Sequence, residues 1–164
     1  MTEIGGAAFC ACGSLEKITI PNGVNEIERW VFSDCRSLKE VTIPSRVTEI
    51  GEAAFRGCRS LKEVTIPNSV KKIEHGGFKG CRSLKEVTIP SSIIKIGEEA
   101  FSSCRSLKEI IFYDGVNVNL EIGKGALANC PNLDTIKYKG NLSEVQKSMF
   151  IYKIGRNINF VQIN

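Results

Sequence analysis

The chain has 164 residues, 42% of them hydrophobic and 24% charged, which is typical of one globular unit with a continuous core. The net charge is only +4, and basic residues alternate with acids, as in Arg36, Lys39 and Glu40, so we expect a mixed solvated surface and no nucleic-acid partner. No apolar run approaches the roughly 20 residues of a membrane span, and residues 1–5 do not resemble a signal peptide, so we expect no membrane insertion.

The first residues, Thr2-Glu3-Ile4-Gly5, align with Thr48-Glu49-Ile50-Gly51 further along the chain. The sequence therefore begins halfway through a repeating unit and has no polar cap. We expect either a longer array or an open edge that pairs with another copy. Self-association through this N-terminal edge would use five apolar residues of the first unit: Ile4, Phe9, Leu15, Ile18 and Ile20.

A 23-residue repeat governs the chain from this point. The same leucine recurs at Leu15, Leu38, Leu61, Leu84 and Leu107, and Leu133 follows after 26 residues. The phenylalanine of each unit, at Phe9, Phe32, Phe55, Phe78 and Phe101, stands three residues before a cysteine; in the sixth unit Leu127 replaces it. The unit reads Ala-Phe-x-x-Cys-x-Ser-Leu-x-x-Val-x-Ile-Pro-x-x-Val-x-x-Ile-Gly.

Each unit has a physical interpretation. Residues 38–43 alternate apolar and polar side chains and contain β-branched residues, which predicts a short half-buried strand that Pro44 ends. After a turn, Val47 and Ile50 return to the core, and residues 52–55 favour a single helical turn. One unit cannot bury its apolar face alone, so the units must stack at about 4.8 Å into a solenoid.

The last third departs from the period. Three extra residues within 113–119 predict a protruding loop. We place the solenoid at residues 1–139 and a C-terminal cap at 140–164. In the cap, residues 141–147 predict a short capped helix, followed by Met149, Phe150 and Ile151 to cover the last unit. The alternation of Ile158, Phe160 and Ile163 predicts a closing extended segment.

The repeating motif resembles the BspA-like (treponemal-type) leucine-rich repeats, over about residues 1–139 in six near-periodic copies. The resemblance implies a right-handed solenoid with a parallel sheet on its concave face. It also implies adhesion to host proteins or other cells, and a cell-surface or secreted location if the chain is part of a longer family member. The chain itself carries no recognisable secretion signal.

Six of the seven cysteines occupy one position of the repeat, where a small apolar side chain facing the core is expected: Cys12, Cys35, Cys58, Cys81, Cys104 and Cys130. Parallel side chains in register do not point at one another, which argues against disulfides, and a linear row does not converge on a zinc ion. We therefore expect buried free thiols and no metal or cofactor.

The sequence also gives little indication of a catalytic site. His75 is the only histidine, and we expect it to be a solvated surface residue. A row of glutamates, Glu40, Glu63, Glu86 and Glu109, recurs in one environment, whereas a catalytic pair of carboxylates needs two. Since no phosphate loop or dinucleotide fingerprint appears, we expect no enzyme.

The remaining functional class is recognition of a partner by the protein surface. Positions on the strand face are nearly uniform until the fifth and sixth units. There we expect an apolar and basic patch beside the extra loop, formed by Glu109, Ile111, Tyr113, Lys137 and Lys139. Trp30, the sole tryptophan, is either an exposed anchor for a partner or a side chain packed on the neighbouring unit. The sequence thus favours an adhesin-like protein-binding module of unknown partner. The alternative is a structural or consensus-type repeat scaffold with no dedicated ligand.

Overall fold

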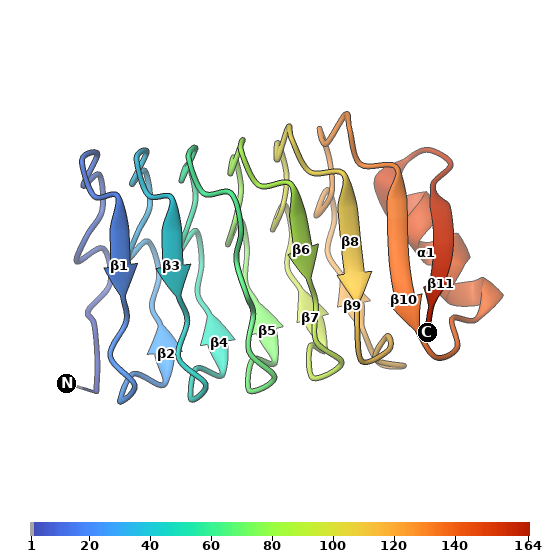
Figure 1. Ribbon diagram of the computed structural model, residues 1–164, viewed down its shortest axis with the longest axis horizontal. Helices are drawn as coiled ribbons and strands as arrows, with labels where there is room; N and C mark the ends of the chain where they lie inside the picture. Colours follow the sequence, from blue (N-terminus) through green and yellow to red (C-terminus); the bar gives the residue numbers. More distant parts are fainter. Residues whose placement is uncertain (1) are drawn as a thin grey trace.

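The computed structural model describes residues 2–164, and over this range the chain winds into six coils stacked along one axis, with its two ends at opposite ends of the stack (Figure 1). We number the coils by their core residue, from Phe9 in coil 1 to Phe101 in coil 5 and Leu127 in coil 6. Within residues 2–164 no helix has the length and apolar character needed to cross a bilayer.

The first sheet side of the solenoid carries a strand from every coil except the third, and one more strand from the C-terminal segment. Its strands are β1 (Lys17–Thr19), β3 (Glu40–Thr42), β6 (Glu86–Thr88), β8 (Glu109–Phe112), β10 (Thr135–Lys139) and β11 (Asn159–Ile163). β1 pairs with β3, and β6, β8, β10 and β11 form a four-stranded parallel sheet. A single bridge between Thr65 and Thr88 joins the third coil to this sheet. The predicted strands are therefore confirmed in every coil but the third, with three residues in coils 1, 2 and 4 and four or five residues in coils 5 and 6.

A second parallel sheet follows the proline turns of coils 1 to 4 and the loop at residues 113–119 in coil 5. Its strands are β2 (Glu26–Ile27), β4 (Glu49–Ile50), β5 (Lys72–Ile73), β7 (Lys95–Ile96) and β9 (Glu121–Ile122). Ile122 pairs with Ile96 although 26 residues separate them, so the three extra residues leave the stacking register intact. They are accommodated in a loop at residues 113–119, where Val118 is 86% exposed.

The core is a set of ladders of identical side chains. The phenylalanine rings of coils 1 to 5 stack with centroids 5.1 to 5.5 Å apart and within 15° of parallel. Leu38, Leu61, Leu84 and Leu107 are fully buried beside them. A single coil could not shield these side chains from water, so burial between neighbours holds the stack together.

The third side of the solenoid differs from the expected helical turn at residues 52–55. There the chain makes successive β-turns, closed by bonds from Ala54 N–H to Gly51 O at 3.2 Å and from Cys58 N–H to Phe55 O at 3.3 Å. Ala53 and Gly57, the third residues of these turns, have φ of 50° and 71°, as type II turns require. The intervening N–H groups of Ala53, Phe55 and Gly57 donate to the next coil at 2.8 Å. Bonding between coils thus replaces the bonds that a helix would have made within itself.

The C-terminal segment covers the last coil. Helix α1 (Glu144–Ile154) begins at Ser143, whose hydroxyl accepts the Gln146 N–H in a capping box, and it is longer than the predicted 141–147. Phe150 is buried against Phe112 and Phe160, at centroid distances of 5.5 and 6.4 Å. β11 then pairs in parallel with β10, so the predicted helix and the closing extended segment are both present.

Candidate protein-binding surface

The outward face of the first sheet is uniform over most of its length. In coils 2 to 4 a glutamate and a threonine alternate with a buried valine, as in the strand Glu40-Val41-Thr42. Glu40 forms an ion pair with Lys17 at 2.6 Å, and the hydrogen bond from Lys17 lowers the pKa of this carboxyl. Because the same polar pair recurs in coils 2 to 4, this part of the face offers a repeated surface with little local information.

The uniform rows end at β8 and β10. Ile111 replaces the threonine in β8, and the register places it beside Lys137 of β10. The Lys137 ammonium contacts the Glu109 carboxylate at 2.6 Å. The structure thus brings three of the predicted site residues into one cluster.

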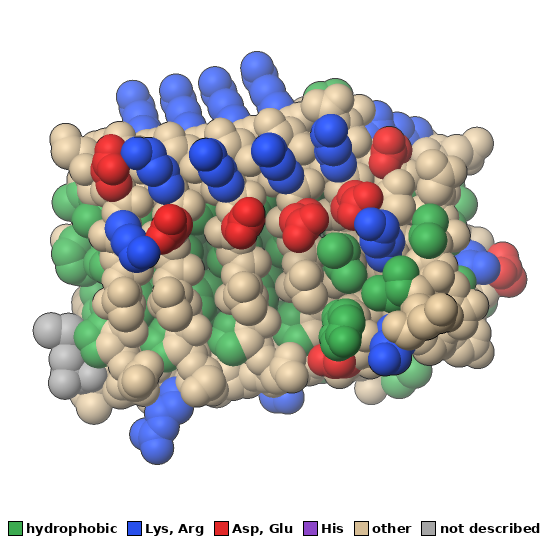
Figure 2. Space-filling view, in the orientation of Figure 1, with side chains coloured by type: hydrophobic (Ala, Val, Ile, Leu, Met, Phe, Trp, Pro, Cys, Tyr) green, Lys and Arg blue, Asp and Glu red, His purple; other side chains and the backbone are tan. Residues whose placement is uncertain are grey.

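Tyr113 and Lys139 extend the cluster toward the loop. Tyr113 is 56% exposed, and the Lys139 ammonium lies 5.5 Å from the centre of its ring. A cation at this distance from the ring face is attracted by the ring's quadrupole. We call Glu109, Ile111, Tyr113, Lys137 and Lys139 the β8–β10 patch; Figure 2 shows this end of the sheet face, where apolar side chains replace the regular rows.

Sequence reasoning missed one neighbour of the patch. Val161 of β11 pairs with Lys137 and is 42% exposed, so Ile111, Lys137 and Val161 lie in one row across three strands. The alternation around Phe160 indicated a strand, but only the crossover through α1 shows that this strand adds to β10. The patch therefore reaches the C-terminal edge of the sheet.

Trp30 lies apart from this cluster, in the turn segment between β2 and β3. Trp30 is 49% exposed and lines a hollow with Gly6, Ala7 and Glu52 of the neighbouring coils. Its φ of 61° is unusual for a bulky residue, yet the equivalent Ala7, Ala53 and Glu99 share this conformation. The left-handed backbone at Trp30 is therefore a requirement of the coil and no special sign of function.

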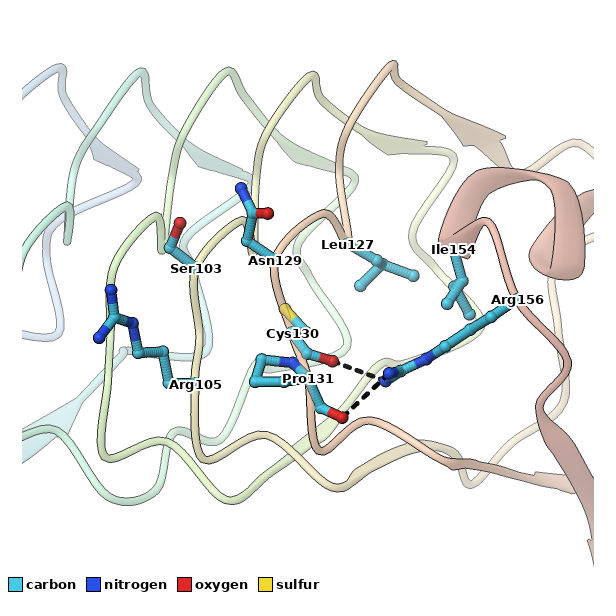
Figure 3. A pocket seen from close by; sticks show the side chains of 8 residues that line it. All are labelled: Ser103, Arg105, Leu127, Asn129, Cys130, Pro131, Ile154 and Arg156. Carbon is cyan, nitrogen blue, oxygen red and sulfur yellow. Dashed lines mark hydrogen bonds between the residues drawn. The ribbon is translucent and has the colours of Figure 1, made fainter.

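A cavity of about 420 Å³ lies between the last coil and α1 (Figure 3). Arg156 enters it from beyond the helix and donates hydrogen bonds to the carbonyl oxygens of Cys130, Pro131 and Leu133. Arg105, on the opposite wall, does not converge with Arg156 (Figure 3). Through these hydrogen bonds the guanidinium of Arg156 ties the segment after α1 to the last coil.

The cysteine ladder consists mainly of buried, unreactive thiols. Cys35, Cys58, Cys81, Cys104 and Cys130 are buried free thiols, as predicted, whereas Cys12 and Cys10 in coil 1 are exposed, which corrects the expectation that all six ladder positions face the core. Burial raises the pKa of Cys35 from its ordinary value near 9 to about 11 and raises the pKa of Cys81 well above that value. The protonated thiol is neither a good nucleophile nor a metal ligand. Within residues 2–164 no cluster of three or more potential ligands could hold a metal ion.

Comparisons with known proteins agree with this architecture. The model of the BspA type leucine rich repeat region matches the chain in six copies, over residues 2–120 and 31–159. No curated protein sequence matches the chain significantly.

Several solved bacterial structures are similar. A leucine rich repeat protein of T. pallidum superposes with a TM-score of 0.70 and 27% identity, over 89% of this chain and 68% of that protein. A leucine rich cell surface protein of Faecalibacterium prausnitzii gives 0.64 and 31% identity, over 82% of this chain and 42% of that protein. The pneumococcal vaccine antigen PcpA gives 0.81 over 99% of this chain and 39% of that protein; at 22% identity this likeness concerns the fold alone.

Proposed function

This chain belongs to the BspA-type leucine-rich repeat family, and from that premise we propose that it is a non-enzymatic module that binds another protein through the β8–β10 patch. Leucine-rich repeat proteins are typically interaction modules that do not catalyse reactions. The observation that carries the proposal is the break in the uniform sheet face at Ile111 and Tyr113.

The chemistry of the patch supports a protein partner. Interfaces are enriched in aromatic anchors, and the exposed Tyr113 is such a side chain, with the apolar Ile111 in the same patch. The ion pair between Glu109 and Lys137 and the contact of Lys139 with Tyr113 hold these side chains in place before binding. A preordered patch loses less conformational entropy when a partner docks.

We further propose an adhesin-like role, in which the partner is a host protein or a protein of another cell. The similar F. prausnitzii protein is described as a cell surface protein, and PcpA as a vaccine antigen. This chain spans less than half of either protein, so the surface location is carried over as part of the proposal.

The second candidate is a structural or consensus-type scaffold without a dedicated ligand. The observation that favours it is the near identity of the inner units, in which Cys-Arg-Ser-Leu-Lys-Glu-Val-Thr-Ile-Pro recurs unchanged at 35–44, 58–67 and 81–90. A scaffold would need no difference between coils on its exposed face, whereas the β8–β10 patch is such a difference.

The test measures binding of the purified chain to a panel of purified extracellular matrix proteins by interferometry. The double variant Tyr113→Ser/Lys139→Gln should weaken binding of the captured protein by about tenfold or more, as loss of an interface anchor does. The matched control is Tyr152→Ser/Lys153→Gln, because Lys153 also lies over the ring of an exposed tyrosine, at 5.9 Å. That control should bind like the unmodified chain.

Two outcomes would contradict the proposal. Equal weakening by both double variants would show that the patch is not the contact surface. Absence of binding to every member of the panel would favour the scaffold. A variant at the other candidate residue, Trp30→Ala, separates the two predicted sites, since it should leave binding unchanged.

A further inference from the structure

Stacking the coils changes how the charges of this chain are distributed. Along the sequence, basic and acidic residues alternate, but in the solenoid each repeat position forms its own row. The residue after the core cysteine gives one row, at Arg36, Arg59, Arg82 and Arg105, and the residue after the core leucine gives another, at Lys39, Lys62, Lys85 and Lys108. All eight side chains are exposed. Figure 2 shows the two basic rows along the upper edge of the sheet face.

The backbone fixes the spacing of these rows. The Lys85 N–H donates to Lys62 O at 3.3 Å, and the Lys108 N–H donates to Lys85 O at 2.8 Å. The Arg row is tied in the same way, because the Ser83 N–H donates to Arg59 O at 3.2 Å. Neighbouring cations therefore stand about 5 Å apart at their Cα atoms, and four of them span about 15 Å.

Most of these cations have no acidic partner. Within residues 2–164 the ion pairs of the two rows occur only at the N-terminal end, between Arg36 and Asp34 at 3.6 Å and between Lys39 and Glu16 at 3.0 Å. The glutamates of the adjoining row that form ion pairs do so elsewhere, Glu40 with Lys17 and Glu109 with Lys137. Like charges at this spacing repel one another, and a bound polyanion would remove that repulsion.

Each row ends after four coils, and a third set of hydrogen-bond donors lies between the two rows. The Lys row ends in an acid on each side, at Glu16 and Asp134, and the Arg row ends at Gly13 and Pro131. Between the two rows lie four half-exposed serines, Ser37, Ser60, Ser83 and Ser106, whose hydroxyls make no hydrogen bond within the described chain. The surface thus presents guanidinium, hydroxyl and ammonium donors side by side in four successive coils.

We propose that these two rows, the basic edge, bind a linear sulfated polysaccharide. Arginine forks and ammonium groups match the oxygens of tetrahedral oxyanions, and a regular row of them matches an anion repeated along a chain. The basic edge contains no aromatic residue on which the bases of single strands could stack, and no helix that could enter a duplex groove. A sulfated sugar chain requires neither feature.

The test measures the affinity of the 164-residue chain for a size-defined heparin oligosaccharide at about 150 mM salt and over a salt series. The variant Arg59→Gln/Lys62→Gln/Arg82→Gln/Lys85→Gln removes the centre of the basic edge. We expect its dissociation constant to rise by at least about tenfold and the slope of log affinity against log salt to fall by about three. The matched control, Arg29→Gln/Arg46→Gln/Lys71→Gln/Lys124→Gln, loses the same four charges at exposed positions elsewhere and should change the dissociation constant less than about twofold.

Competing ligands decide the class of polyanion. Desulfated heparin, poly-glutamate and a DNA duplex of matched charge should all bind more weakly than heparin. The proposal is overturned if both variants lose affinity equally, if heparin does not bind, or if one of these competitors binds as tightly. As a second measurement on the unmodified chain, heparin should protect Lys62, Lys85 and Lys108 from acetylation while Lys71 and Lys124 stay reactive.

The polysaccharide-binding proposal and the protein-binding proposal can be tested independently of each other. The double variant Tyr113→Ser/Lys139→Gln leaves the basic edge intact and should bind heparin within about twofold of the unmodified chain. Loss of heparin binding in that variant would move the polyanion site to the β8–β10 patch and overturn the inference.

Discussion

The thiol of Cys81 donates a hydrogen bond to the carbonyl oxygen of Phe55 in the preceding coil, at 3.2 Å. The same oxygen accepts the Cys58 N–H at 3.3 Å, so both of its acceptor positions are occupied. Equivalent thiol bonds of 3.0 to 3.2 Å link the other coils. Cysteine suits this position because it is apolar enough for the core and still satisfies a buried carbonyl.

The thiol ladder predicts selective chemical labelling. Of the seven cysteines, only the exposed Cys10 and Cys12 should react rapidly with a thiol reagent in the native state. Mass spectrometry without reductant should find the five buried cysteines reduced. Rapid native labelling of Cys35, Cys58 and Cys81, or disulfides among them, would contradict the assignment.

Stability should fall at alkaline pH. Burial raises the pKa of Cys35 to about 11, and it also raises the pKa values of Cys58, Cys81, Cys104 and Cys130. Above the ordinary pKa of a thiol, near 9, the unfolded chain loses protons that the folded chain retains, so each thiol lowers the free energy of unfolding by up to about 1.4 kcal/mol per pH unit. Below that pH the thiols are protonated in both states, so their stabilisation of the folded chain is fully present.

Urea denaturation between about pH 7.5 and 10 with reductant measures this slope. The variant Cys58→Ala removes one titrating thiol and should make the decline with pH shallower. A free energy of unfolding that stays constant to about pH 10 would show that the thiols are not buried in their neutral form.

The phenylalanine stack should be the main source of core stability. Phe55 is fully buried between Phe32 and Phe78, with ring centroids at 5.3 and 5.1 Å. Phe55→Ala should lower the free energy of unfolding by about 3 to 5 kcal/mol, because a cavity remains between two rigid coils. A loss below about 1 kcal/mol in chemical denaturation would show that the stack is not the core.

Much of this architecture could be predicted from the sequence, because identical residues at a fixed spacing can bury their apolar faces only by stacking. The ladders of Phe55, Cys58 and Leu61 follow from that argument, as does the strand beginning at Glu40. The turn segment could not be predicted in the same way. Alanines at 53 and 54 favour a helix locally, but hydrogen bonds to the neighbouring coil impose a left-handed residue twice in each turn segment.

A pair of adjacent alanines tests that correction. Ala53 has a φ of 50°, where glycine is less strained, whereas Ala54 is fully buried without a left-handed backbone. Ala54→Gly should therefore cost at least about 1 kcal/mol more in unfolding free energy than Ala53→Gly. Equal costs, as expected in a helical turn, would contradict the β-turn conformation.

The arrangement of the β8–β10 patch was predictable only in part. The 26-residue step from Leu107 to Leu133 places Ile111 beside Lys137, so their proximity follows from the period. Val161 lies in the same row, but its strand follows α1 and is not part of a repeat unit, so the 23-residue period does not predict its register. The ion pair between Glu109 and Lys137 depends on side-chain conformations that spacing does not specify.

The N-terminal edge should promote self-association. Among residues 2–164, coil 1 packs against a coil on one side only, and Phe9, Leu15 and Ile18 are half-buried there. Ile4 and Ile20 are buried, so of the five apolar residues expected to form this edge only Phe9, Leu15 and Ile18 are partly exposed. We expect a two-fold dimer of the 164-residue chain at about 100 μM with reductant, measured by light scattering. A polar cap fused before residue 1 should yield a monomer. A dimer that persists with this cap would show that the N-terminal edge is not the dimer interface.

The central claim is that the β8–β10 patch contacts a protein partner. The most direct measurement replaces Tyr113 with a photo-crosslinking phenylalanine analogue and exposes the chain to extracellular proteins under light. We predict a discrete covalent adduct from position 113 and none from the same probe at the exposed Tyr152 on α1. No adduct at position 113, or equal adducts at both positions, would contradict the account.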